Sequence, residues 1–324
     1  MIVVIGGLVG GLSPNAPSAT LIATVATGPT RAIALPPYGT RNLLAAVGTD
    51  GDLRLWRSPE DPVTLDTGST RMSSAAFDAT GSLLVAGAAD GTVRLWSVDD
   101  PGAPLRGTVL AGRGSAINTV AVVDGGTRIT AGSADGTVYA WDTRKPATQR
   151  GEVLEKYPGQ VTAIAAITDS GLLFTGNDRG QVWAGLQSGS DAEVWSGSAA
   201  GAGVTALAAG PGARSRAATL AVGDATGGVQ LRSGRTLFQE PQTLVRGTGR
   251  GAVTALAFGP GGTPLYIGTA TGSVQVVRVP AHGPAERLGP VRTGTAIAVR
   301  AFSPDGTRVA VESVAGTVRV FALG

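Results

Sequence analysis

The chain has 324 residues, of which 43% are hydrophobic, 15% charged and 5% aromatic, and it contains 50 Gly and 19 Pro. So many turn-forming residues are atypical of a helix bundle, yet the hydrophobic content suits a folded core, so we expect a turn-rich globular protein. The absence of Cys and the single His, His282, exclude disulfides, thiol nucleophiles and cysteine metal sites, and remove nearly all imidazole chemistry.

The charge balance is weakly basic, with 26 Lys and Arg against 23 Asp and Glu and a net charge of +3. No run of like charges or nucleic-acid motif occurs, so we expect no nucleic-acid partner. The frequent use of Arg, Ala and Gly suggests a bacterial, GC-rich genome.

The N-terminal segment 1–12 is apolar but shorter than the roughly 18 residues that a membrane span needs, so we expect no membrane insertion. It could serve as a signal-peptide core with small residues at 16–19, but it lacks a charged start. We therefore expect a cytoplasmic protein, with secretion as the alternative. Residues 1–17 form an N-terminal extension, interpreted either as the remnant of an upstream repeat or as an apolar tail.

One phrase recurs seven times along the chain, at intervals of 40 to 47 residues. Each copy has Gly in its second position, and the copies are DGDLRLW (50–56), DGTVRLW (90–96), DGTVYAW (135–141), RGQVWAG (179–185), TGGVQLR (226–232), TGSVQVV (271–277) and AGTVRVF (315–321). This period matches the roughly 40–45 residues of a four-stranded propeller blade.

Apolar residues alternate within each phrase, as Val93 and Leu95 do in the second copy. This period of two indicates a strand with one buried face, and the Asp-Gly before it indicates a tight turn that closes a hairpin. Further apolar runs complete four strands per repeat. The sequence thus predicts an all-β fold, a seven-bladed β-propeller of four-stranded antiparallel blades over residues 18–324.

The phrases resemble the WD-repeat β-propeller family, whose units end in Trp-Asp after an Asp-Gly turn. Trp56, Trp96 and Trp141 hold the Trp position, but only Trp141-Asp142 is a literal Trp-Asp, and the last four units are degenerate. The residues that carry the repeat pattern are Asp50, Gly51, Trp56, Asp90, Gly91, Trp96, Asp135, Gly136, Trp141 and Asp142.

In the family, a His, a Ser or Thr, the turn Asp and the Trp can form a hydrogen-bonded network. No repeat here has that His, and only Asp50, Asp90 and Asp135 match the turn Asp. We therefore expect no blade to hold the complete network, and the ring to depend on apolar packing.

The seventh unit ends just after its third strand, which leaves its blade without an outer strand. Residues 20–26 precede the first unit and have the character of such a strand. We expect them to close the last blade, because closure pairs an otherwise exposed strand edge.

No catalytic, cofactor or metal motif is found, since the recurring Gly residues have neither phosphate-loop nor dinucleotide-fold spacing. The candidate partner-binding surface is the side of the ring where strand alternation gathers the blade-to-blade segments and the second-to-third turns. The basic residues of those segments are Arg31, Arg71, Arg113, Lys156, Arg246, Arg250 and Arg292. The alternative is that each is an independent solubilising charge.

The resemblance implies a non-catalytic scaffold or sensor module that binds other proteins without a cofactor, either as a monomer or as part of a larger multidomain protein. The alternative is a propeller enzyme of the lactonase or glycosidase type, with a site at the central channel. Three or more acidic or His side chains converging at the channel mouth would favour the enzyme.

Overall fold

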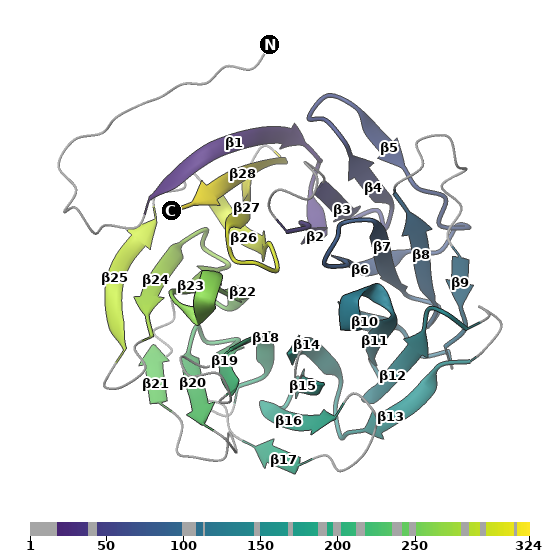
Figure 1. Ribbon diagram of the computed structural model, residues 1–324. Coiled ribbons are helices and arrows are strands. Elements are labelled where there is room, and N and C mark those ends of the chain that lie inside the picture. Colours follow the sequence, from purple (N-terminus) through teal and green to yellow (C-terminus); the bar gives the residue numbers. More distant parts are fainter. Residues whose placement is uncertain are drawn as a thin grey trace.

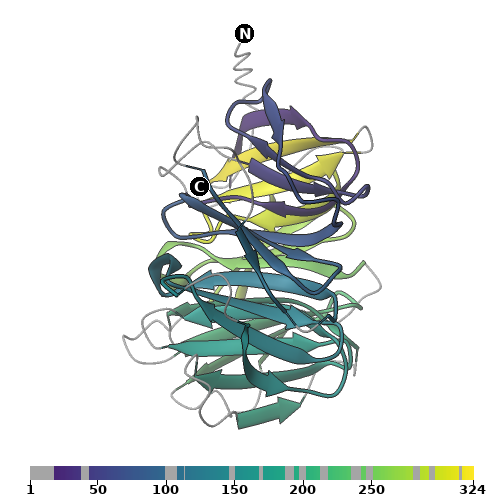
Figure 2. The same cartoon turned by 90° about the vertical axis from the view of Figure 1, so that its right-hand side faces the viewer.

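The protein is an all-β, seven-bladed propeller in which seven four-stranded antiparallel sheets surround a central axis (Figure 1). Viewed edge-on, the ring is a flattened disc whose strands run across its thickness (Figure 2). The computed structural model describes residues 18–37, 44–98, 108–112, 114–145, 150–167, 171–186, 193–196, 202–211, 218–234, 242–245, 251–279, 285–291, 296–313 and 316–324. The fold predicted from the repeats is confirmed.

Six blades are built from four consecutive strands, from the axis outward. Blade 1 contains β2 (Thr30–Ala34), β3 (Leu44–Gly48), β4 (Leu53–Trp56) and β5 (Pro62–Thr64). Blade 2 contains β6 (Met72–Phe77), β7 (Leu83–Ala88), β8 (Val93–Ser97) and β9 (Thr108–Leu110). Blade 3 contains β10 (Ile117–Val123), β11 (Arg128–Ser133), β12 (Thr137–Asp142) and β13 (Glu152–Lys156). Blade 4 contains β14 (Val161–Ile167), β15 (Leu172–Asn177), β16 (Gln181–Leu186) and β17 (Glu193–Ser196). Blade 5 contains β18 (Val204–Pro211), β19 (Ala218–Asp224), β20 (Val229–Gly234) and β21 (Gln242–Val245). Blade 6 contains β22 (Val253–Phe258), β23 (Leu265–Thr269), β24 (Val274–Arg278) and β25 (Glu286–Val291).

The seventh blade takes its outer strand from the other end of the chain. It consists of β26 (Ala296–Phe302), β27 (Arg308–Ser313), β28 (Thr317–Leu323) and β1 (Ala19–Ala26). β1 runs antiparallel to β28, so that Ala19 lies opposite Leu323 and Ala26 opposite Thr317. In Figure 1 the purple β1 lies along the yellow β28, so residues 20–26 complete this blade. Residues 1–17, predicted as an extension, lie outside the described residues.

In the described part, two short turns of 3-10 helix join first to second strands: η1 (Asp124–Gly126) between β10 and β11, and η3 (Pro260–Gly262) between β22 and β23. No helix within the described ranges is long and apolar enough to cross a membrane.

The core lies between the blades. The described residues form seven buried apolar clusters, and each cluster joins one blade to the next. In the cluster between blades 1 and 2, for example, Trp96 of β8 packs with Leu53 and Leu55 of β4. Because each sheet buries its apolar faces only against its neighbours, the blades stabilise one another and the ring folds as a unit.

The three repeat tryptophans occupy such seams. Trp56 lies between blades 7 and 1, Trp96 between blades 1 and 2, and Trp141 between blades 2 and 3, with exposed fractions of 3%, 1% and 5%. The indole nitrogens of Trp96 and Trp141 are buried without a hydrogen-bond partner in the described part of the chain. Their contribution is therefore apolar packing.

Candidate functional site

One side of the ring carries both the turns between second and third strands and the connectors that lead from one blade to the next. We call this side the connector face. In six blades, the residue after the second strand donates its backbone N–H to the carbonyl of the residue just before the first strand. These bonds are Thr49 to Pro29, Ala89 to Arg71, Ala134 to Ala116, Asp178 to Gln160, Ala225 to Gly203 and Ala270 to Ala252, at 2.8–3.1 Å. The strand alternation thus brings the two kinds of segment together.

The repeat glycines adopt the positive φ of the turn, and they leave space for the neighbouring connector. Gly136 has a φ of 85°, which favours Gly, and a Cβ built on it would lie only 2.0 Å from the carbonyl oxygen of Tyr157 in the next connector. At Gly51, with a φ of 91°, a Cβ would lie 2.7 Å from the Cβ of Arg71. The sequence predicted the turn, whereas the close approach of the neighbouring connector becomes visible only in the folded ring.

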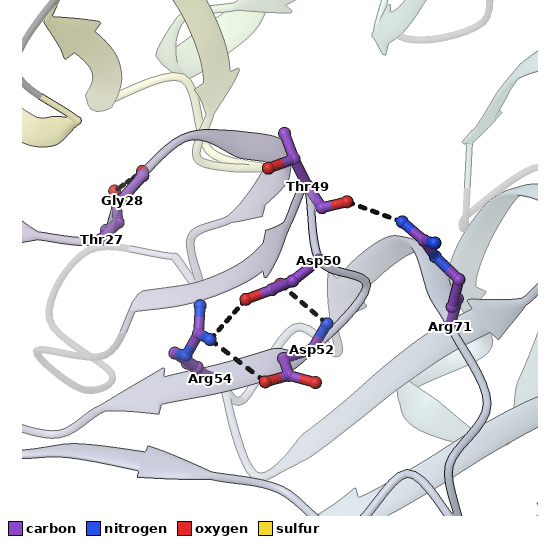
Figure 3. Close-up of polar contacts among 7 residues, drawn as sticks. All are labelled: Thr27, Gly28, Thr49, Asp50, Asp52, Arg54 and Arg71. Carbon is purple, nitrogen blue, oxygen red and sulfur yellow. Dashed lines mark hydrogen bonds and ion pairs between the residues drawn. The ribbon is translucent and has the colours of Figure 1, made fainter.

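Asp50 lies within the first of these turns. Its carboxylate accepts a hydrogen bond from Arg54 Nη2 at 2.6 Å and another from the backbone N–H of Asp52 at 3.0 Å (Figure 3). The hydrogen bond from Arg54 lowers the pKa of Asp50 below its ordinary value. Arg54 Nη2 also donates to Oδ2 of Asp52 at 3.1 Å, so the three side chains form a small ion-pair cluster.

Asp90 occupies the same position in blade 2. Burial raises its pKa, but hydrogen bonds from Thr92 and Thr70, together with the charge of Arg94, outweigh this effect and hold the pKa below its usual range. Thr70 belongs to the connector between blades 1 and 2, and its hydroxyl donates to Asp90 Oδ2 at 3.1 Å. Asp90 therefore ties the turn to the connector.

Asp135 repeats the pattern in blade 3. Burial again raises the pKa, and hydrogen bonds from Ser133 and Thr137 with the charge of Lys156 lower it by more. Asp142, in the literal Trp-Asp pair, accepts hydrogen bonds from Arg144, which lower the pKa of its carboxyl. All four repeat carboxylates are therefore engaged by their own turns and neighbours.

The predicted basic residues occupy different positions. Arg71 Nη2 donates to the carbonyl oxygen of Thr49 at 2.8 Å, and Lys156 Nζ lies 3.8 Å from Asp135 Oδ2, so both are used within the ring. Arg113, Arg246, Arg250 and Arg292 lie outside the described residues, as does His282.

Arg31 differs from Arg71 and Lys156. It lies in β2, at the register shift between Thr30 and Ala32, and is exposed. It makes no hydrogen bond or ion pair with any residue of the described part.

The residues at the corresponding shift in blades 2 to 5 bond to backbone carbonyls. Ser73 donates to Gly87 and Ile117, Asn118 to Val161, Thr162 to Gly176 and Val204, and Thr205 to Gly223. Short polar side chains at this position therefore hold neighbouring strands, whereas the Arg31 guanidinium bonds to no residue of the described ranges.

The described ranges contain no group of three or more His, Cys, Asp or Glu side chains that could hold a metal ion. The carboxylates described above lie in blades 1 to 3: Asp50, Asp90 and Asp135 are each in the turn of a different blade, and Asp142 ends β12.

Residues 62–97 and 106–142 match the family model described as WD domain, G-beta repeat. Two repeats of the propeller thus match the WD-repeat model, and blades 2 and 3 retain the clearest repeat sequence.

No curated protein matches the chain significantly in sequence. Among solved structures, a chain of the "Crystal Structure of Mitotic Checkpoint Complex" is similar with a TM-score of 0.74 and 17% identity, over 99% of each chain. At this identity the similarity establishes the fold.

Proposed function

We propose that the protein is a non-catalytic interaction scaffold or sensor, and that a protein partner docks on the connector face. The observation that carries this proposal is Arg31, an exposed guanidinium without a described partner at a position where other blades use bonded Ser, Thr or Asn. A free guanidinium suits recognition of a carboxylate, because it can donate two parallel hydrogen bonds.

The similar solved chain comes from a protein complex, which accords with a role in assembly. The partner we infer has an acidic docking surface. From the sequence pattern we expect Arg113, Arg250 and Arg292 to belong to the same basic surface as Arg31. Within this proposal the protein acts in the cytoplasm, with other proteins as its partners.

The test begins with a partner captured from the source cells and then purified. Arg31→Glu should lower its association rate about tenfold at low salt, and the difference should shrink as salt screens the charges. Lys145→Glu is a matched control, because Lys145 is exposed beyond the third strand of blade 3, on the opposite side of the ring. Equal association rates for the parent and Arg31→Glu, at low and at physiological salt, would refute a role for this surface.

A further inference from the structure

Two arginines stand out on the seven inner strands, the strands nearest the axis of the ring. In these strands, as the structure describes them, Arg31 of β2 and Arg300 of β26 are the only charged residues. The two strands are neighbours, because blades 1 and 7 meet where the ring closes (Figure 1). The inner strands are therefore basic at this one seam.

Arg300 is an extra residue in its strand. Every inner strand has one register shift close to its start, such as the shift between Val253 and Ala255 in β22. Among the seven inner strands of the described structure, β26 alone has a second shift, between Val299 and Ala301. A bulge of this kind leaves one residue unpaired and redirects its side chain. Arg300 is that residue, and the other six inner strands have no counterpart of it.

The guanidinium of Arg300 is held by a buried carboxylate. Glu312 of β27, only 3% exposed, lies at a position that Gly occupies in five of the blades. Its Oε2 accepts a hydrogen bond of 2.5 Å from Arg300 Nε and also contacts Nη2. Its Oε1 accepts one of 2.8 Å from the backbone N–H of Thr30, the residue before Arg31. Glu312 thus fixes the direction of one arginine and contacts the strand that carries the other.

Glu312 engages only part of the Arg300 guanidinium. An arginine side chain has five N–H donors, and the contacts with Glu312 use one on Nε and one on Nη2. The other three, two on Nη1 and one on Nη2, lie along one edge and can donate two parallel hydrogen bonds to a carboxylate. Within the described ranges Nη1 has no hydrogen-bond partner, and 29% of the Arg300 side chain is exposed.

The pair of Arg300 and Glu312 is a poor source of stability. An ion pair that is largely removed from water seldom stabilises a fold more than apolar residues of similar size, because both charges lose hydration. The other blades have Gly, or Val47 in blade 1, in the place of Glu312 and do without the inserted arginine. A binding role accounts for both departures together, because the carboxylate orients the guanidinium.

We propose that Arg300 binds the acidic partner, which inserts a carboxylate side chain toward the axis between β26 and β2. This inference rests on the function proposed above and adds a second point of contact to it. Glu312 neutralises one of the two positive charges, so one positive charge remains for a single carboxylate. Arg31, exposed at the connector end of β2, attracts the partner, and Arg300 holds the inserted carboxylate after docking.

The experiment measures association and dissociation rates of the purified partner with the full chain by biolayer interferometry. The double variant Arg300→Gln with Glu312→Gln removes both charges of the pair, so the net charge stays the same and no buried carboxylate is left unpaired. The matched control is Arg128→Gln with Glu152→Gln. It removes an ion pair of 3.2 Å between β11 and the outer strand β13, away from the inner strands.

We expect the partner to dissociate about tenfold faster from the variant of Arg300 and Glu312, the effect of losing one charge-assisted hydrogen bond. Its association rate should change by less than about twofold, because the net charge that steers the encounter is the same. The control should keep both rates of the parent. If the double variant does not fold, Arg300→Lys replaces it. The lysine keeps a cation beside Glu312 but lacks the two parallel donors, so dissociation should still be several times faster.

Trp56→Phe separates binding from a loosened seam. Trp56 belongs to the apolar cluster of the same seam and has no charge, so this variant weakens the seam and should release the partner at the parent's rate. Urea unfolding measures how far each variant weakens the fold. Equal acceleration of dissociation by Trp56→Phe, or by the control pair, would overturn the inference.

An unchanged dissociation rate in the variant of Arg300 and Glu312 would overturn it as well. That failure is distinct from failure of the proposed function, which appears in the association rate of Arg31→Glu. If Arg31→Glu slows association while the variant of Arg300 and Glu312 releases the partner like the parent, the connector face is the docking surface and Arg300 has only a structural role.

Discussion

Arg71 Nη2 in the connector to blade 2 donates a hydrogen bond of 2.8 Å to the carbonyl oxygen of Thr49 in the turn of blade 1. Figure 3 shows this bond beside the Asp50 turn, with Arg71 reaching across from the neighbouring blade. The same two segments meet again where Met72 N–H donates to the Gly51 carbonyl at 2.9 Å. On the connector face, therefore, hydrogen bonds between blades already use donors and acceptors that a partner would otherwise contact.

Gly136→Ala should destabilise the protein more than the loss of glycine flexibility explains. Both Gly136, with a φ of 85°, and Gly114, with a φ of 91°, require a left-handed backbone, and a Cβ at Gly114 meets nothing within 4 Å. We expect Gly114→Ala to cost about 1–2 kcal/mol in the free energy of unfolding. Gly136→Ala should cost about 2 kcal/mol more, because the connector must move away from the new methyl group.

Urea unfolding of both alanine variants measures the difference. Equal losses would show that the connector at Tyr157 yields without cost, which would contradict the close approach as a reason for Gly136.

Trp96→Ala should lower the free energy of unfolding by about 3–5 kcal/mol, the usual effect of deleting a large aromatic side chain from a core. Trp56→Ala and Trp141→Ala should have similar effects, because all three side chains are buried in seams. Val109→Ala is the control, since Val109 is 40% exposed on an outer strand. Losses below about 1 kcal/mol at all three tryptophans would contradict their assignment to the seam cores.

Deletion of residues 1–28 should strongly destabilise the fold, because it removes β1 and leaves the edge of β28 unpaired. Deletion of residues 1–17 is the control, as it leaves every residue of β1 in place. Thermal unfolding followed by circular dichroism compares the two. A chain without residues 1–28 that melts within a degree or two of the parent would show that β1 is dispensable.

The turn carboxylates should make stability depend on pH in the acid range. Asp50, Asp90 and Asp135 have folded-state pKa values below 3.8, so the unfolded chain binds protons first as the pH falls. Their contribution is fully present above 3.8 and is lost as the pH falls through the lower folded-state pKa values.

Replacement of all three residues by Asn should therefore flatten the decline in stability between neutral and acid pH. Urea unfolding over this range measures the effect. Parallel curves for the parent and the triple variant would contradict the prediction, since the engaged carboxylates would then contribute nothing to the acid sensitivity.

The sequence predicted the fold because each repeat carries the same local signals for a turn and a half-buried strand. The Gly of each phrase, such as Gly91, forces the turn, and the alternation of Val93 and Leu95 buries one face of the strand behind it. These signals are local, so they survive in blades whose Trp and Asp have been lost.

The details of the candidate site depend on contacts between blades, which a local pattern does not contain. Arg31, Arg71 and Lys156 are all basic and all near connectors, yet only the structure separates Arg31, which has no partner among the described residues, from the two that contact the ring. Glu312 lies at a second-strand position that Gly occupies in five blades and Val47 in blade 1, but the hydrogen bond that it accepts from the Thr30 N–H becomes apparent only when the ring closes.

The position of β1 in the last blade also has a consequence for synthesis on the ribosome. Thr27 contacts Gly316, 289 residues further along the chain, and at about 5–20 residues per second that separation takes roughly 15–60 seconds to translate. Throughout this interval β1 has no β28 to pair with. It contains an apolar stretch that includes Leu21 and Ile22, both still half exposed in the folded ring. The nascent protein therefore presents an unpaired, aggregation-prone strand for nearly the whole of its synthesis, which makes β1 the segment where a chaperone that binds extended apolar chain would act.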